Sequence, residues 1–205
     1  MRDDKKESQG AFEKCLSIQQ ISIPNSVTSI GNFVFDGCKA LKYISIGNSV
    51  NSIGYYAFSE CSSLVSISIP SSVTSICDFA FDGCSSLKKV SLLGEINAIK
   101  KGTFYCCSSL KHITFPLSLK SIEYYSFKWC SSLEEISIDS HSISIDEFAF
   151  DGCISLNKIR IHSSSASIYE NAFFGCKSLE KIEIPSSLIP KINSVFLPNA
   201  SIIIS

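Results

Sequence analysis

The sequence predicts an α/β repeat protein that winds as a right-handed solenoid, with parallel strands on one face and short strands and helical turns on the other. Two observations predict this fold. Cysteines recur every 23 residues in eight copies, at Cys15, Cys38, Cys61, Cys84, Cys107, Cys130, Cys153 and Cys176. Phenylalanines stand three residues before them, at Phe12, Phe35, Phe58, Phe81, Phe104, Phe127, Phe150 and Phe173. Such a fixed period indicates that each copy is one structural unit stacked on the next.

The first element of each copy is a short strand that begins a few residues after the cysteine. After Cys84, for example, apolar residues stand at Leu87, Val90 and Leu92, and the segment ends in the alternation of a half-buried strand. Because proline lacks a backbone donor, it ends a ladder strand. Proline directly follows the predicted strand in four copies, at Pro24, Pro70, Pro116 and Pro185.

The remainder of each copy returns the chain to its starting side. Val73 and Ile76 indicate a returning segment with a second short strand. The stretch D-F-A-F-D-G-C that ends at Cys84 predicts one helical turn or a pair of turns. Glycine can supply a positive φ in such a turn. It stands directly before the cysteine at Gly37, Gly83, Gly152 and Gly175.

Because one coil cannot bury its own apolar side, like residues of successive coils are expected to stack into buried ladders. The chain divides into a polar lead (residues 1–9), a solenoid of eight 23-residue coils (residues 10–197) and a degenerate C-terminal edge (residues 198–205). Within that edge, Ile202 to Ile204 predict a final strand. Neither end carries a recognisable polar cap, which leaves two interpretations open: a fragment, or a chain that associates end to end.

Composition and charge exclude several partners. The formal net charge of −1 gives no long-range field that attracts nucleic acid or anionic lipid. No apolar run approaches the roughly 20 residues of a membrane span, so direct membrane insertion is not expected. The polar N-terminus has no signal-peptide pattern. The chain as written is therefore either cytosolic or a piece of a longer secreted protein.

The pattern I-P-x-S-V-x-S-I-x-x-x-A-F-x-G-C-x-S-L resembles the BspA-like leucine-rich repeat family, which includes surface proteins of bacteria and parasitic protists. The resemblance covers residue 10 to about residue 197. It implies a leucine-rich-repeat solenoid, a non-enzymatic binding role and, often, display on the cell surface and adhesion. This sequence lacks the signal peptide, membrane anchor and caps of full-length members.

The ladder cysteines are expected to be buried free thiols. They occupy a slot for a small apolar residue, and neighbours in the ladder would point the same way, which suits a disulfide torsion poorly. Scattered disulfides are the alternative. No C-x-x-C or Cys/His cluster indicates zinc. Cys106 replaces the glycine before Cys107, and we expect it to be the most reactive thiol.

No constellation of residues predicts catalysis. His112 faces outward from a strand, and His141 and His162 lie at turns. Asp139 is close to His141 in sequence, but no nucleophile, base and orienter come together. No glycine-rich phosphate loop is present. The sequence therefore predicts no catalytic residue, metal site or cofactor, and the chain is not expected to be an enzyme.

The best functional candidate is the exposed side of the predicted strands. Seven residues after each cysteine, six copies carry serine or threonine, followed by Arg160 and Glu183. Five residues after each cysteine the residue type varies freely, from Gln20 onward. The predicted binding residues of this row are Tyr43, Ser66, Lys89, His112, Glu135, Lys158 and Lys181. Either these rows are simply solvated, or the varying row is a recognition surface, as in leucine-rich repeats generally.

A second exposed set, near the predicted turns, comprises Tyr55, Tyr124 and Trp129. These aromatic residues either cover the edge of the core or offer an anchor for a partner. The residues and the resemblance together predict a non-catalytic module that binds protein or glycan on another cell or matrix. The alternative is an intracellular protein-interaction scaffold.

Overall fold

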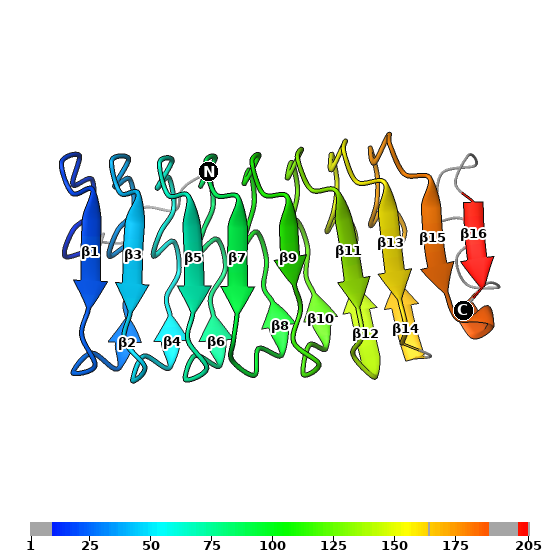
Figure 1. The fold of residues 1–205 in the computed structure, drawn as a ribbon, viewed down its shortest axis with the longest axis horizontal. Helices are drawn as coiled ribbons and strands as arrows, with labels where there is room; N and C mark the ends of the chain where they lie inside the picture. The colour runs from blue at the N-terminus through cyan, green and yellow to red at the C-terminus, as the bar shows by residue number, and fades with distance from the viewer. Residues whose placement is uncertain (1–9, 164, 189–200, 205) are drawn as a thin grey trace.

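A computed structural model describes residues 10–163, 165–188 and 201–204. The described residues form a parallel-strand solenoid in which each turn of the chain lies beside the next (Figure 1). Seven 23-residue turns separate the first residues of its first and eighth long strands. The polar lead predicted for residues 1–9, the solenoid boundary at residue 197 and residues 198–200 and 205 of the predicted edge lie outside the described residues.

Strands occupy two faces of the solenoid. The described long strands are β1 (Gln20–Ile23), β3 (Tyr43–Ile46), β5 (Ser66–Ile69), β7 (Lys89–Leu92), β9 (His112–Thr114), β11 (Glu135–Ile138), β13 (Lys158–Ile161), β15 (Lys181–Ile184) and β16 (Ser201–Ile204). The described return strands are β2 (Ser29–Ile30), β4 (Ser52–Ile53), β6 (Ser75–Ile76), β8 (Ala98–Ile99), β10 (Ser121–Ile122), β12 (Ser142–Ile145) and β14 (Ser165–Ile168). Both the strands after the cysteines and the short return strands are therefore confirmed.

Every strand pair is parallel and places residues 23 apart in the sequence opposite one another up to β15, as in the pairing of Ser66 with Lys89. The long strands are divided into short sheets, such as β1–β3 and β5–β7–β9, and backbone hydrogen bonds also connect one sheet to the next. The Val65 N–H donates to the Lys42 carbonyl at 3.3 Å between the coils of β3 and β5. The last strand, β16, pairs with β15 in parallel after only 20 residues, with Lys181 opposite Ser201. The predicted final edge strand is thus present.

The segment before each cysteine is not helical, so the helical part of the α/β prediction is not confirmed. In the described residues the one helical element is the 3₁₀ turn η1 (Ser186–Leu188). The Cys84 N–H closes a turn on the Phe81 carbonyl at 3.3 Å, but the Phe81 N–H donates to Thr103 of the next coil at 2.9 Å. Backbone donors that bond to the next coil are unavailable for a helix, and this segment stacks in the same way as the strands.

Positive backbone φ values repeat at two positions of this segment. The predicted glycine position before the cysteine has φ values of 70–73° at Gly37, Gly83, Gly152 and Gly175. Side-chain-bearing residues adopt the same conformation in four other copies, at Lys14, Glu60, Cys106 and Trp129. The second position, five residues before the cysteine, is mostly aromatic, with φ values of 53–61° at Phe33, Tyr56, Phe79, Tyr125 and Phe148. Left-handed residues stop a helix from continuing, which explains why turns replace it.

The core consists of rows of identical side chains. Phe58, Phe81 and Phe104 are fully buried, and neighbouring rings of the phenylalanine row stack with centroids 5.0–5.5 Å apart. Leucine and isoleucine rows from the strands pack around them. Each coil therefore buries its apolar side against the coils before and after it, as the sequence predicts.

Replacing Phe81 with alanine tests this core. We expect Phe81→Ala to lower the free energy of unfolding by about 3–5 kcal/mol, because the vacated ring leaves a cavity between two stacked neighbours. Phe174→Ala is the matched control, since that ring is 59% exposed, and should change stability by less than about 1 kcal/mol. Urea unfolding followed by circular dichroism measures both. A loss below about 1 kcal/mol for Phe81→Ala would mean that the ring is not buried.

Candidate functional site

The long-strand face is the outward side of the long strands β1, β3, β5, β7, β9, β11, β13 and β15. In a strand, successive side chains point to opposite sides. Of each four-residue strand, the second and fourth residues therefore enter the core, and the first and third face outward. In β5 these are buried Ile67 and Ile69, against exposed Ser66 and Ser68. This inside–outside assignment agrees with the sequence prediction.

The predicted binding residues form one continuous row, which we call the variable row. Each is the first residue of a long strand, and the parallel register sets it beside its copy in the next coil: Ser66 pairs with Lys89, and Lys89 with His112. Tyr43 is 58% exposed, and Lys158 alone of the seven is half-buried. The row comprises Gln20, Tyr43, Ser66, Lys89, His112, Glu135, Lys158 and Lys181. The structure thus brings the predicted residues together, and their role in binding stays a prediction.

The third residue of each long strand belongs to a second outward row. Its first six members carry hydroxyl groups, and we call them the hydroxyl row: Ser22, Ser45, Ser68, Ser91, Thr114 and Ser137. The Ser45 hydroxyl donates to the Ser22 hydroxyl at 2.8 Å, so adjacent coils are bridged at the surface. A shallow hollow lies between β1 and β3, where both rows meet. Its lining consists of Gln20, Ile21, Ser22, Tyr43, Ile44 and Ser45. Here the face offers hydroxyl, amide and phenol groups and no charge.

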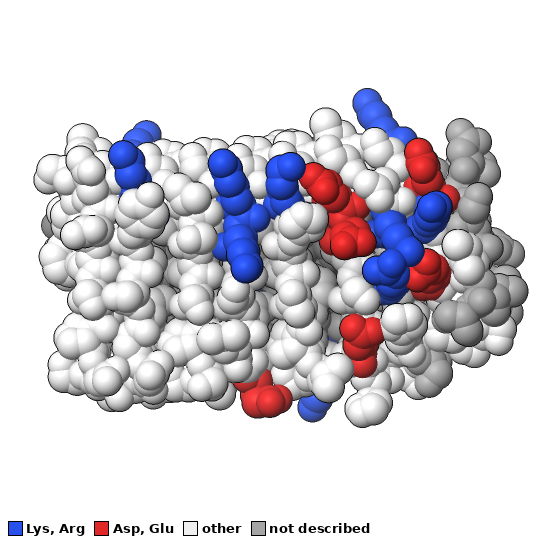
Figure 2. All heavy atoms as spheres, viewed as in Figure 1, with Lys and Arg blue, Asp and Glu red and all other residues white. Residues whose placement is uncertain are grey.

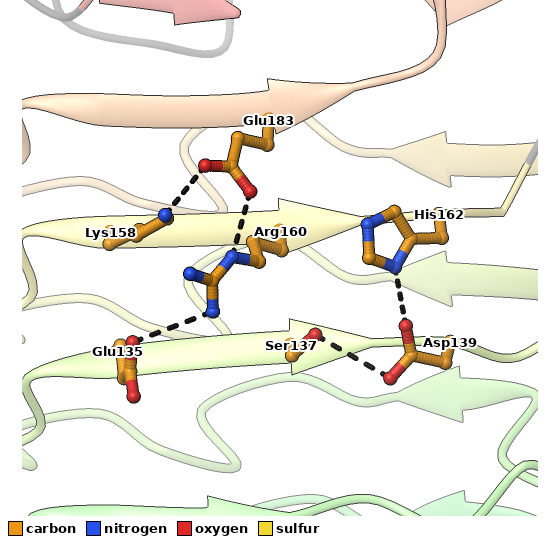
Figure 3. A network of polar contacts seen from close by, with 7 residues as sticks. All are labelled: Glu135, Ser137, Asp139, Lys158, Arg160, His162 and Glu183. Carbon is orange, nitrogen blue, oxygen red and sulfur yellow. Dashed lines mark hydrogen bonds and ion pairs between the residues drawn. The ribbon is translucent and has the colours of Figure 1, made fainter. Parts of the chain in front are cut away.

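A network of ion pairs covers the C-terminal part of the face, over β11, β13 and β15 (Figure 3). The Glu183 carboxylate accepts from Lys158 Nζ at 2.6 Å and from Arg160 Nε at 2.7 Å. Arg160 Nη1 also lies 3.7 Å from Glu135. Hydrogen bonds from Lys158 and Arg160 hold the pKa of Glu183 below its usual range, although partial desolvation opposes them. Because these charges satisfy one another, few of them are left to bind a partner.

A carboxylate–imidazole pair lies at the end of the same strands. His162 Nδ1 contacts Asp139 Oδ1 at 2.5 Å, and the Ser137 hydroxyl donates to the other oxygen of Asp139 at 3.5 Å (Figure 3). The serine therefore bonds to the carboxylate rather than to the imidazole. A nucleophile needs direct contact with its base, so these three residues do not form a triad. The sequence places Asp139 close to His141, but its partner in the structure is His162, which lies 23 residues after Asp139. The sequence prediction missed this pair.

Seven of the eight ladder cysteines, from Cys38 to Cys176, are buried, and Cys15 is half-buried. All ten cysteines are free, which agrees with the expectation for the eight of the ladder. The Cys84 thiol donates to the Phe58 carbonyl at 3.1 Å, and the same contact recurs along the ladder at 2.9–3.3 Å. Desolvation raises the pKa of these thiols, including Cys84 and Cys107. Such thiols pack the core and are poor nucleophiles.

The prediction that Cys106 is the most reactive thiol is not supported. Its side chain is half-buried, and desolvation followed by the charges of Asp82 and Glu60 raises its pKa. Reactive thiols require the opposite, an electropositive setting that lowers the pKa. The nearby cation Lys128 lowers it too little to compensate.

Near the turns, ring contacts join Tyr105, Tyr124, Tyr125, Trp129 and Phe148 into one aromatic cluster. Trp129 and Tyr55 are exposed, as expected, whereas Tyr124 is half-buried. Lys128 Nζ lies 4.3 Å from the centroid of the Tyr125 ring and 4.9 Å from that of Trp129. Its charge is already paired with Asp151 at 2.7 Å. The cluster is therefore held together by internal contacts.

Residues 10–163, 165–188 and 201–204 contain no group of three or more His, Cys, Asp or Glu side chains placed to hold a metal ion. The same residues include no helix long and apolar enough to cross a membrane.

The fold and the face define a class: a repeat solenoid of parallel strands that presents one varying row of side chains. A match to a protein-family model identifies the family within this class. The model of the BspA type leucine rich repeat region matches residues 5–134 and 120–203, with six copies. The chain belongs to this family. Leucine-rich repeat proteins of this kind are generally protein-interaction modules and typically non-enzymatic.

Solved structures of bacterial proteins resemble the solenoid. The leucine rich repeat protein TpLRR of T. pallidum is 24% identical and superposes with a TM-score of 0.77, covering 89% of this chain and 87% of its own. A leucine-rich repeat protein from Eubacterium ventriosum is 26% identical at a TM-score of 0.73, covering 78% of this chain and 44% of its own. A leucine rich cell surface protein from Faecalibacterium prausnitzii is 24% identical at a TM-score of 0.44, covering 90% of this chain and 64% of its own. No curated protein matches the sequence.

The ion-pair network makes a prediction about acid. A carboxylate whose pKa is lowered by folding stabilises the protein above its unfolded pKa, about 4.3, and this stability is lost as pH falls through the folded pKa. Glu183→Gln should therefore lose less stability than the wild type between neutral pH and about pH 3. Glu180→Gln is the control, since Glu180 makes no ion pair with the described residues. Equal acid sensitivity of Glu183→Gln and wild type, measured as urea midpoints, would contradict the network.

Proposed function

We propose that this chain is a non-catalytic binding module whose long-strand face recognises a macromolecule through the variable row. One observation carries the proposal: side-chain type changes at almost every coil in this row, while the buried phenylalanine, cysteine and leucine rows stay nearly constant and the buried strand rows stay apolar. In β5, β7 and β9 the row presents a hydroxyl, an ammonium and an imidazole. A fixed backbone with a changing outer row can encode specificity without altering the fold.

The shape of the face favours a large partner. Small-molecule sites are usually enclosed, whereas the hollow between β1 and β3 is shallow and open to solvent. Protein interfaces are broad and rely on a few aromatic or charged residues within a polar surround. Tyr43, 58% exposed at the edge of that hollow, is such a residue. The proposed partner is protein or glycan on another cell or matrix, in line with the adhesive members that the sequence resembles.

An intracellular interaction scaffold is the second candidate. It is favoured by the ten free cysteines, because proteins in oxidising compartments commonly form disulfides and cytosolic proteins rarely do. The binding surface is the same in both candidates, and only the compartment of the partner differs.

A binding screen with variable-row variants tests the proposal. The purified protein is applied to arrays of extracellular proteins, cytosolic proteins and glycans, and each hit is titrated with Tyr43→Ala, His112→Ala and Glu135→Ala. We expect at least one variant to weaken binding by about tenfold or more, while the stability of each changes by less than about 0.5 kcal/mol. The array that supplies the hit discriminates the two candidates.

The control for this screen is Ser71→Ala, an exposed position in the turn after β5 and outside the variable row. Binding that survives all three variable-row substitutions would contradict the assignment of the binding face. Unfolding of the variants would contradict the inside–outside assignment instead.

A further inference from the structure

Charge divides the long-strand face into two halves. From β11 to β15, positive and negative side chains alternate and pair with one another, as in the contacts of Glu183 with Lys158 and Arg160. Over the long strands β1, β3, β5, β7 and β9, Figure 2 shows basic side chains and no acidic ones on the strand surface. The two halves meet at Glu134, which lies 3.0 Å from Lys111 and 4.0 Å from His112.

Three lysines of the N-terminal half are left without a counter-charge. Lys42, Lys88 and Lys89 are all exposed, and in residues 10–163, 165–188 and 201–204 none of them forms an ion pair. We call this group the lysine triplet. From Gln19 to Ser22, and in the corresponding four residues of the next four coils, the sequence contains no Asp or Glu. The triplet is therefore a local positive patch on a chain whose net charge is −1.

The spacing of the triplet suits an extended partner that runs along the solenoid. Lys42 and Lys88 occupy the same position two coils apart, which corresponds to about 10 Å at the spacing of neighbouring strands. Lys89 continues the patch into the variable row. Exposed Ser66 and Tyr43 lie between and beside these cations and add hydroxyl donors that a carboxylate can accept from.

We propose that the lysine triplet is the recognition centre of the long-strand face and that its ligand is an acidic segment of a protein partner. This inference rests on the proposed function, because it names the partner chemistry of the same face. A protein is favoured over an anionic glycan because the patch is continuous with exposed Tyr43, and tyrosine is enriched in the cores of protein interfaces. Nucleic acid is disfavoured because the acidic Glu134 and Glu135 interrupt the basic stripe.

The C-terminal half has a different role under this inference. Its charges stabilise one another, so a partner would have to break existing pairs to use them. Lys181 is the exception: it is exposed, occupies the same strand position as Lys89 and forms no ion pair with the described residues. It lies beside Lys158 and Glu183 rather than among free cations. It therefore offers a matched control for Lys89.

The test measures binding of a fluorescent peptide of alternating glutamate and serine to the whole chain by anisotropy. A peptide of alternating glutamine and serine and a heparin oligosaccharide are the comparison probes. We expect the glutamate peptide to bind, the glutamine peptide not to bind, and affinity to fall when NaCl rises from about 50 mM to about 500 mM. Lys89→Glu should weaken binding by about tenfold or more, and Lys88→Glu by a similar factor, while Lys181→Glu, which changes the net charge by the same amount, should change it by less than about twofold.

Each other outcome decides against the proposal. An equal loss for Lys181→Glu would mean that only overall charge matters, and binding of heparin alone would replace the protein partner with an anionic glycan. Absence of glutamate-peptide binding at low salt would also overturn it. The proposed function fails separately: a partner from the array whose binding depends on Tyr43 or His112 but not on Lys88 and Lys89 would retain the binding face and exclude the lysine triplet.

Discussion

Stacking of each coil on an identical neighbour at a fixed 23-residue offset is the constraint on which the rest of the structure depends. The buried phenylalanines touch their own copies above and below, as Phe81 does with Phe58 and Phe104. A change of size in one coil would therefore open or crowd two contacts at once. Sequence variation is consequently greatest in the outward rows, and this is why one of those rows is the best candidate for recognition.

The same offset controls the chemistry of the surface. Most interacting surface side chains come from neighbouring coils and so lie about 23 residues apart in the sequence, as in the pairs of Arg160 with Glu183 and of Asp139 with His162. Where successive coils carry opposite charges, the face neutralises itself. Where they carry like charges or none, as around Lys88, the face stays open to a partner. In this chain, charge is therefore best compared down a row of the solenoid rather than along the sequence.

The sequence predicted the strands, the buried rows and the exposed row because alternation and period are visible in it. Phe81 and Cys84 are buried as expected for residues that never vary. Of the two alternatives for D-F-A-F-D-G-C, the turns are present and the helical turn is not confirmed. Nothing in these letters signals that Phe79 takes a positive φ and that the neighbouring N–H groups bond to the next coil. Burial around Cys106 and the exact pairing of charges also depend on three-dimensional neighbours. Comparing residues 23 apart would have found His162.

Native-state amide hydrogen exchange tests the stacking most directly, because it reports the stability of individual backbone bonds. The Phe81 and Gly83 N–H groups donate to carbonyls of the next coil at 2.9 Å, although both lie in turns. The account predicts that these turn amides are protected to the same degree as the strand amide of Val90. Unprotected exchange at Phe81 and Gly83 beside a protected Val90 would show that the coils do not stack through their turns, and would contradict it.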